Sequence, residues 1–391
     1  MTVIETPEEA RGFNLPERHR LWRDVILPRS IIPLFWLYWL LLLPSWLIGL
    51  PRLRANRRRP AVVAIESGKL GWTHVFFEEL GWTAEEFFGE GAIRREVIDR
   101  EQAYIPQFLA NVGRDSPTHL VLDVRTCGQT WKESLVQAFR VTWHLNIAGI
   151  TPIVFMTDAF FRRQRWQSAV LTAFRGVVIT YADDSIVRRI FPHGRLLGPM
   201  FMPISERRLD WLERQSDECE KSGDVVQFIG SVYPPRSLFL EAASKKLDER
   251  GIRLRINSDK TGTSNEDYWL TLVEADVVLT TTLQGPDRPF MDWVWTQQAV
   301  FRFLETMASG SALLASRVPG IEKYFRPGVD FLEFQSVTEG VTEVERLVRD
   351  PELRARVTRQ GHETAVELIR SKSFWATVNE SLANNSIPVR F

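Results

Sequence analysis

Short apolar runs alternate with longer amphipathic stretches between residues 61 and 200. Runs rich in Val and Ile are typical of buried parallel strands, and apolar residues recurring every three or four positions indicate helices. The predicted strands are 61–65, 120–124, 150–156 and 176–181, and a predicted helix, 131–147, lies among them. Alternation of strands and helices predicts a parallel sheet with helical crossovers, which is a Rossmann-like layer.

A second series of the same kind follows a polar, charge-dense stretch at 199–223, which we take as a domain boundary. Because doubly wound sheets bind ligands at the carboxyl ends of their strands, two such sheets are expected to face a shared cleft. The predicted strands are 225–229, 252–256, 276–281 and 312–316, and the predicted helices are 236–250, 268–274, 294–308, 341–348, 351–367 and 373–382.

Residues 31–50 form 20 consecutive positions without a charge. A helix of that length spans about 30 Å, the thickness of a bilayer's hydrocarbon core. We therefore predict a membrane segment, with amphipathic rings suited to the interface at Trp36, Tyr38, Trp39 and Trp46.

Both flanks of the segment are basic, and Pro33 and Pro44 interrupt it. A single span and a dip into one leaflet both fit this pattern. The arginines that follow, between Arg52 and Arg59, place the rest of the chain on the cytoplasmic side in either case. The expected location is the cell membrane.

The composition of the chain mainly excludes classes of function. The 391 residues carry 49 basic and 49 acidic side chains, so no overall field favours nucleic acid. The two cysteines, Cys127 and Cys219, do not make a disulfide scaffold. The six histidines show no metal-ligand spacing and no D-x-D sequence occurs, so neither a metal nor a cofactor is expected.

The most informative stretch is 301–334. A helix that buries Val300, Leu304 and Ala308 is expected to end at Gly310, directly before the strand 312–316. Glu305 lies among apolar residues of this helix, where a carboxylate must either find a partner or face a ligand.

These residues resemble a known family. Glu305-Thr-Met-Ala-Ser-Gly310, the strand after it, Val318-Pro-Gly320 and Gly328-Val-Asp330 are similar to the donor-binding domain of glycosyl transferases group 1, the family-4-like enzymes. The stretch is closest to their spore-maturation-type branch. The resemblance covers roughly residues 225–385 and is weaker over 61–200. It implies the α/β GT-B fold, in which two Rossmann-like domains face a cleft, and sugar transfer with retention of configuration.

The resemblance also implies roles in donor binding. Glu305 would hold the ribose hydroxyls of the nucleotide, and Gln297 stands where the family has a sugar-contacting glutamate. Arg302 would face the diphosphate, or form an ordinary surface salt bridge. Gly230, Ser231 and Arg236 follow the first strand of the donor domain, where the family binds phosphate, and Lys260 corresponds loosely to a second basic residue.

Two further groups belong to the N-terminal half. Gly68, Lys69 and Gly71 occupy the place of the family's glycine-rich loop, or form a plain strand-to-helix turn. Asp123 and Asp158 end apolar strands, so each is placed to orient or deprotonate the acceptor hydroxyl, or else caps a helix. We take these two as the candidate catalytic residues.

The sequence therefore predicts a membrane-attachment region at 1–59, an acceptor domain at 60–210 and a nucleotide-sugar donor domain at 224–391. The expected enzyme is a membrane-associated hexosyltransferase of glycolipid or cell-envelope synthesis that acts on a lipid or lipid-linked acceptor. Two alternatives stay open: an epimerase-like enzyme that converts nucleotide sugars, or an inactive membrane scaffold. Since every donor motif follows residue 224, a chain without residues 1–51 is expected to fold and bind nucleotide.

Overall fold

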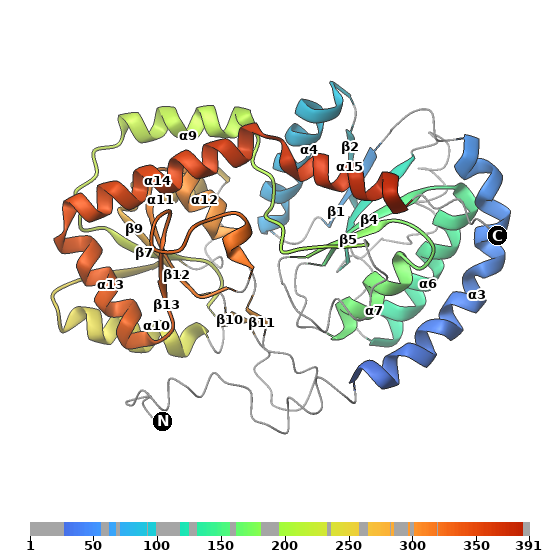
Figure 1. Ribbon diagram of the computed structural model, residues 1–391, viewed down its shortest axis with the longest axis horizontal. Helices are drawn as coiled ribbons and strands as arrows, with labels where there is room; N and C mark the ends of the chain where they lie inside the picture. The colour runs from blue at the N-terminus through green and yellow to red at the C-terminus, as the bar shows by residue number, and fades with distance from the viewer. Residues whose placement is uncertain are drawn as a thin grey trace. The chain divides into compact units, whose positions relative to one another are not determined.

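The computed structural model divides the chain into two compact units, and its C-terminal helix belongs to the unit formed by the N-terminal half (Figure 1). The N-terminal unit contains the described residues up to Met200 and those from Phe374 onward. The C-terminal unit contains the described residues from Phe201 to Ser373. The residues described are 27–55, 62–67, 71–91, 93–98, 118–124, 131–156, 162–180, 195–232, 236–257, 265–281, 283–284, 296–297, 301–318 and 320–385.

The N-terminal unit is built on a parallel sheet with the strand order β2-β1-β3-β4-β5-β6. The four strands predicted from apolar runs are all present, which confirms the expected parallel α/β layer. The strands are β1 (Val62–Ser67), β2 (Ile93–Ile98), β3 (His119–Asp123), β4 (Thr151–Met156), β5 (Val177–Thr180) and β6 (Leu196–Leu197). The helices of this unit include α4 (Gly71–Phe88), α6 (Trp131–Ala148) and α7 (Arg162–Leu171).

The apolar segment forms most of helix α3 (Leu27–Ala55), whose inner face packs on α6 and α7. Leu42 is fully buried in the core that α6 and the sheet share. Trp39 and Trp46 both stack on Phe174, at 5.0 and 5.3 Å between ring centroids, and Trp39 Nε1 donates to the Ala173 carbonyl at 2.9 Å. These two tryptophans, expected at a membrane interface, thus pack into the protein.

The contact between α3 and α6 is unusually close at Gly49. A Cβ at this position would lie 1.6 Å from the carbonyl oxygen of Asn146, so only glycine fits. A buried polar chain runs beside it: Asn146 Nδ2 donates to Ser45 Oγ at 3.1 Å, and Arg175 Nη2 donates to Asn146 Oδ1 at 3.3 Å. Helix α3 is therefore part of the core of this unit.

This packing changes the expectation for a shortened chain. Removing residues 1–51 would take away Leu42, Ser45 and Gly49 and expose the apolar side of α6. We now expect such a chain to be destabilised rather than freely soluble. Within the part of the chain that the structure describes, no helix combines the length and apolar character needed to cross a membrane.

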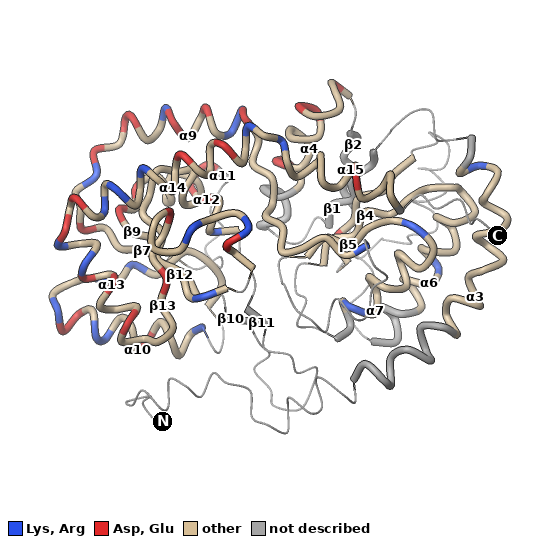
Figure 2. Tube along the Cα trace, in the orientation of Figure 1, with Lys and Arg blue, Asp and Glu red and all other residues tan. Residues whose placement is uncertain are grey.

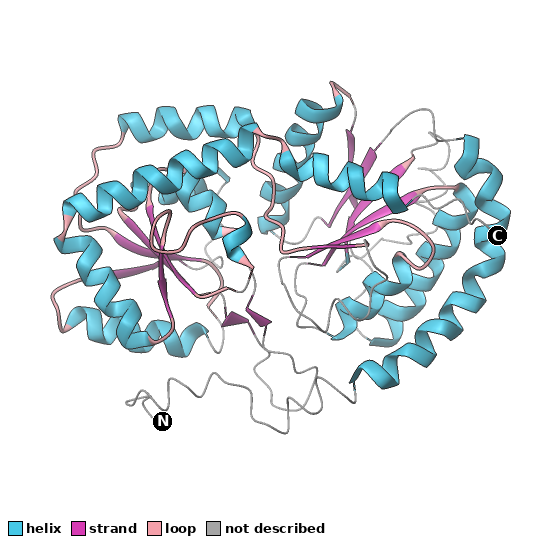
Figure 3. Cartoon of the chain, viewed as in Figure 1, coloured by secondary structure: helices cyan, strands magenta, loops and turns pink. Residues whose placement is uncertain are grey.

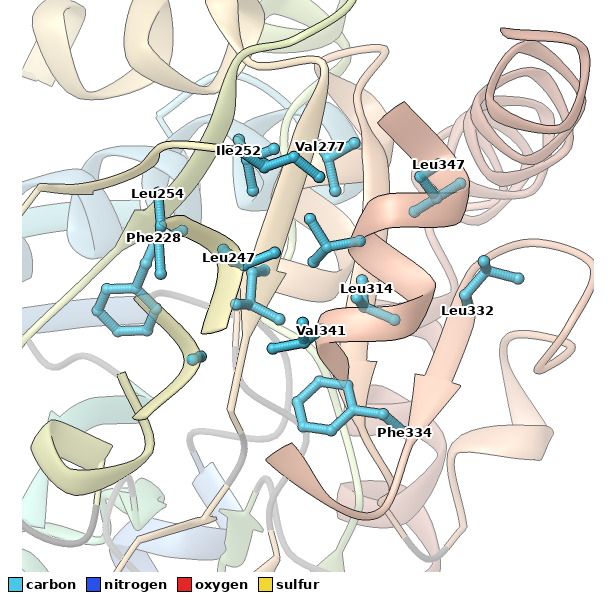
Figure 4. Packing of buried hydrophobic residues seen from close by; sticks show 14 of the residues in the cluster. Phe228, Leu247, Ile252, Leu254, Val277, Leu314, Leu332, Phe334, Val341 and Leu347 are labelled. Carbon is cyan, nitrogen blue, oxygen red and sulfur yellow. The ribbon is translucent and has the colours of Figure 1, made fainter. Parts of the chain in front are cut away.

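The C-terminal unit has a second parallel sheet, with the strand order β13-β12-β9-β7-β8. Its core joins side chains of the strands to those of flanking helices, as Figure 4 shows for Phe228, Leu247, Leu314 and Phe334. The strands are β7 (Val226–Ile229), β8 (Leu254–Asn257), β9 (Val277–Thr280), β12 (Ala312–Ser316) and β13 (Leu332–Phe334). The helices are α9 (Glu206–Glu218), α10 (Arg236–Asp248), α11 (Asn265–Glu274), α12 (Arg302–Ala308), α13 (Val337–Arg349) and α14 (Pro351–Arg370).

One predicted helix of this unit is wrong over half its length. Instead of a helix over 294–308, the described residues give the short strand β11 (Thr296–Gln297) and then α12, which begins at Arg302. Thr296 and Gln297 pair in antiparallel fashion with β10 (Leu283–Gln284). A strand partner more than ten residues earlier overrides the local apolar periodicity.

The last helix, α15 (Ser373–Asn385), leaves the C-terminal unit and packs on the N-terminal one (Figure 3). Trp375 is buried there, and its Nε1 donates to Thr83 Oγ1 of α4 at 3.0 Å. Phe374 lies parallel to Phe155 of β4, with ring centroids 6.2 Å apart. The division of the chain thus differs from the predicted one, since the N-terminal unit includes both α3 and the C-terminal helix.

We predict that Gly49→Ala destabilises the N-terminal unit. The added Cβ forces α3 away from α6, and overpacking of this kind costs about 1–3 kcal/mol. The melting temperature should fall by roughly 2–10 °C. As the control, Leu47→Ala on the exposed face of α3 should change stability by no more than about 0.5 kcal/mol. Equal melting temperatures for Gly49→Ala and wild type would mean that α3 is not packed as described.

Candidate functional site

The turn after β7 has a backbone geometry suited to binding a phosphate group. Gly230 has a φ of +141°, which L side chains rarely adopt, and its N–H donates to the Asn257 carbonyl at the end of β8. The turn lies at the carboxyl end of the sheet, directly before α10. This is the edge at which parallel sheets bind ligands, and helix N-termini favour anions.

Two guanidinium groups flank this glycine. A Cβ built on Gly230 would lie 3.7 Å from Nη2 of Arg302 and 3.8 Å from Nη1 of Arg236. Arg302 Nε donates to the Ile229 carbonyl at 2.9 Å, and Arg236 Nη1 donates to the Ser231 carbonyl at 2.9 Å. Each arginine is thus fixed to the turn by a carbonyl group, and both guanidinium groups lie beside Gly230.

Arg302 is also held by a buried ion pair. Its Nη1 lies 2.5 Å from Glu305 Oε2, one turn along α12, and the two side chains are 13% and 6% exposed. Tyr268 of α11 completes the group. Its hydroxyl donates to the same carboxylate oxygen at 2.6 Å and also contacts Arg302 Nη1. The aromatic ring of Tyr268 lies against the guanidinium group of Arg302.

The C-terminal end of α12 is also held in place, by a glycine turn and by hydrogen bonds from a lysine. Gly310 takes a φ of +67° and ends the helix where the sequence predicts. Lys221 Nζ donates to the carbonyls of Gly310 and Ala275 and to Ser311 Oγ. Burial lowers the pKa of Lys221 to about 8, although the nearby carboxylate of Asp276 opposes the shift. Residues 303–308 are all buried, so α12 is enclosed on every side rather than on one face.

The structure therefore brings together five of the predicted donor residues: Gly230, Ser231, Arg236, Arg302 and Glu305. Gln297 lies on β11 instead of on the helix with Glu305, and its side chain is outside the described part of the structure. Lys260, Gly68, Lys69 and Asp158 also lie outside the described residues, and Gly71 is the first residue of α4.

Asp123 ends β3 at the carboxyl edge of the N-terminal sheet, as predicted, and is 2% exposed. His119 begins the same strand and so lies at the opposite edge of the sheet. Burial lowers the pKa of His119 to about 4, so its imidazole is neutral at physiological pH. Asp123 is the one predicted catalytic residue within the described part of the chain.

Sequence reasoning missed Tyr268. It lies 34 residues before Arg302 and 37 before Glu305, and a lone tyrosine in an amphipathic helix carries no signal of its own. The spacing of three residues between Arg302 and Glu305 does indicate a possible pair. Among the side chains that the structure describes, no group of three His, Cys, Asp or Glu residues is arranged to hold a metal ion.

A double-mutant cycle should show strong coupling between Arg302 and Glu305. Removing one partner of a buried pair leaves the other charge uncompensated, so Glu305→Ala alone should cost about 3 kcal/mol. The coupling energy with Arg302→Ala, measured by chemical denaturation, should be about 1–3 kcal/mol.

The matched control is the pair Glu343 and Arg346, which has the same spacing, is 22% and 55% exposed, and is separated by 3.3 Å. An exposed pair of this kind contributes less than about 0.5 kcal/mol. If the two cycles give the same coupling, the Arg302–Glu305 pair does not stabilise α12.

Part of the chain matches a known protein family. Residues 236–373, which begin at the first residue of α10 and end at the start of α15, match a family model described as glycosyl transferase-like. Among curated protein sequences, none is similar enough to the chain to count as a match.

Solved structures extend the comparison to both units. The structure of Anabaena HepE in complex with UDP-glucose matches with a TM-score of 0.52 at 12% identity, covering 83% of this chain and 99% of that one. A glycosyltransferase from Rickettsia africae matches with a TM-score of 0.51 at 6% identity, covering 84% and 100%. Sucrose-phosphate synthase from Thermosynechococcus elongatus matches with a TM-score of 0.50 at 13% identity, with the same coverage. The chain is therefore a glycosyltransferase with the α/β GT-B fold, and residues 236–373 form its glycosyl transferase-like domain.

Proposed function

We propose that this enzyme transfers a sugar from a nucleoside diphosphate sugar to a lipid or lipid-linked acceptor at the cytoplasmic face of the cell membrane. The observation that carries the donor half of this proposal is the pair of guanidinium groups at Gly230. Two guanidinium groups held at a glycine turn, next to the N-terminus of α10, are hydrogen-bond donors of the kind that bind a diphosphate.

The chemistry that follows needs little beyond electrostatics. The bond between the anomeric carbon and the diphosphate oxygen breaks, and a bond to the acceptor oxygen forms. The leaving diphosphate gains negative charge, which Arg236 and Arg302 are proposed to stabilise. The acceptor hydroxyl loses its proton, and a carboxylate of the N-terminal unit, Asp123 or Asp158, is proposed to receive or orient it. We further propose retention of the anomeric configuration, as in the spore-maturation-type branch.

Glu305 has two proposed functions. It fixes Arg302 through the ion pair, and its carboxylate accepts the ribose hydroxyls of the donor when the nucleotide binds. Gln297, Ser231 and Lys260 are proposed to complete the donor site, and the loop with Gly68, Lys69 and Gly71 to close over the phosphates and the acceptor.

Titration with UDP and with uridine tests these assignments, since uridine retains the ribose and lacks the phosphates. UDP is the first probe because HepE, which shares the fold, was solved with UDP-glucose. Arg236→Met and Arg302→Met should each weaken UDP binding about 10- to 150-fold, because hydrogen bonds to charged groups contribute about 1.5–3 kcal/mol. Arg236→Met should leave uridine binding unchanged, because Arg236 does not contact Glu305, whereas Glu305→Gln should weaken both ligands.

Arg346→Met changes an exposed arginine of the same unit and is the control. If UDP, GDP, dTDP and CDP all fail to bind better than their nucleosides, the phosphate site is not at Gly230. If UDP binds but UDP-sugars are converted without a lipid acceptor, an epimerase-like activity replaces the proposal. Binding without any turnover would indicate an inactive scaffold.

Turnover is predicted to be independent of metal ions, because the proposed diphosphate site contains two arginines and the sequence lacks a D-x-D clamp. EDTA should leave the rate of UDP release unchanged in the presence of membrane lipid. Loss of activity with EDTA, followed by recovery on addition of Mg²⁺ or Mn²⁺, would show that a cation rather than the arginines stabilises the leaving group.

A further inference from the structure

The outer face of α3 is a continuous apolar surface. All seven residues that are exposed between Leu37 and Pro51 are apolar. Five of the eight large hydrophobic side chains that are exposed in the described structure lie on this one helix, each 52–59% exposed. They are Leu37, Leu40, Leu41, Leu47 and Ile48, and we call them the α3 stripe. An exposed patch of this kind marks an interaction surface.

The neighbouring helix extends the surface with aromatic and basic residues. The ring centroid of Tyr38 in α3 lies 6.2 Å from that of Phe139 in α6, and the centroid of Phe139 lies 6.1 Å from that of Trp143. All three rings are partly exposed. Val136 and Arg140 of α6 are exposed beside them. Partly exposed aromatic rings next to an aliphatic surface are typical of the boundary between lipid headgroups and acyl chains.

The charge of this surface also favours a membrane. The described side chains of α3 and α6 include Arg52, Arg140 and His144 but no carboxylate. Figure 2 shows the contrast with α9, α13 and α14 of the other unit, where acidic and basic residues alternate along the helix. Arg57, Arg58 and Arg59 follow α3 in the sequence. The described side chains of this surface thus carry basic and no acidic groups, and a basic surface attracts anionic headgroups.

We propose that the α3 stripe lies in the plane of an anionic lipid bilayer and docks the N-terminal unit onto it, rather than crossing it. The inner face of α3 is occupied by its contacts with α6 and Phe174, so the helix has one face for lipid. A helix that lies in the plane of the membrane surface buries its outward apolar face about 5–10 Å into the headgroup boundary. The inference extends the proposed lipid acceptor, but it is argued from the surface of α3 and α6 and not from the donor site.

A second copy of the chain fits the stripe less well. From Leu37 to Pro51 the stripe is about 22 Å long and only one helix wide. That is small beside the roughly 800 Å² per partner of a stable dimer. It also carries no polar side chain, whereas a protein interface usually includes hydrogen bonds, which lipid chains do not require.

Vesicle flotation of the full chain tests the proposal. The wild type should float with phosphatidylcholine vesicles that contain phosphatidylglycerol, and less with phosphatidylcholine alone. L40Q/L47Q should lower the partition coefficient at least about tenfold, because both side chains lose their burial in lipid. L238Q is the matched control, since Leu238 is 51% exposed on α10 of the other unit. It should float as the wild type does.

The depth of residue 40 distinguishes lying in the plane from crossing. A fluorophore on L40C, in a chain with C127S and C219S, should be quenched more by bromines near the headgroup end of the acyl chains than by bromines near the chain ends. A crossing helix gives the reverse order, because residue 40 is the centre of the segment 31–50.

Three results would overturn the docking. If the wild type floats with neither kind of vesicle, the protein does not bind these membranes. If L40Q/L47Q floats as the wild type does, the membrane contact lies elsewhere on the protein. If light scattering shows that the wild type is a dimer and L40Q/L47Q is a monomer, the α3 stripe binds a second copy of the chain. UDP titration of the same samples keeps the two proposals separate, because the donor site is unaffected by loss of flotation.

Discussion

The ion pair between Arg302 and Glu305 is the interaction on which the candidate site of the C-terminal unit depends. Glu305 neutralises a guanidinium group that is almost fully buried, and this allows Arg302 to remain beside Gly230 with its Nε bound to the Ile229 carbonyl. Burying either charge alone would be costly, so the two residues and Tyr268 must be placed together. The pair joins α12 to the end of β7 and so connects the packing of the unit to the charge of its ligand-binding edge.

The helix that carries this pair is fixed by contacts from distant parts of the chain. Lys221 reaches the turn at Gly310 from the segment after α9, and Gly361 of α14 approaches so closely that a Cβ there would lie 2.4 Å from the Asp330 carbonyl and 3.0 Å from Met307. A short helix of seven residues has little stability of its own. Its position therefore depends on the surrounding unit, and a substitution far from Arg302 can still displace the charge next to Gly230.

Local patterns predicted the sheets well because strands buried on both faces leave a clear apolar signal. The strand 312–316 has the predicted bounds, and Gly310 ends the helix before it. The helix over 294–308 was wrong because Thr296 and Gln297 pair with Leu283 and Gln284, a contact that periodicity does not contain. Tyr268 was missed for the same reason, since its contacts with Arg302 and Glu305 arise only in the folded chain. The candidate donor residues were predicted from a motif and not from packing.

Helix α3 shows a limit of hydropathy as a signal. An apolar segment has no preferred side, so the sequence alone could not show that Trp39 and Trp46 face Phe174 while Leu40 and Leu47 face outward. The small residues Ser45 and Gly49, placed four apart, were the available hint, because this spacing puts them on one face and allows close approach to another helix. A long apolar segment that contains such a face can pack against its own domain along one side. It then presents only the opposite side to a partner, which distinguishes it physically from a helix surrounded by lipid.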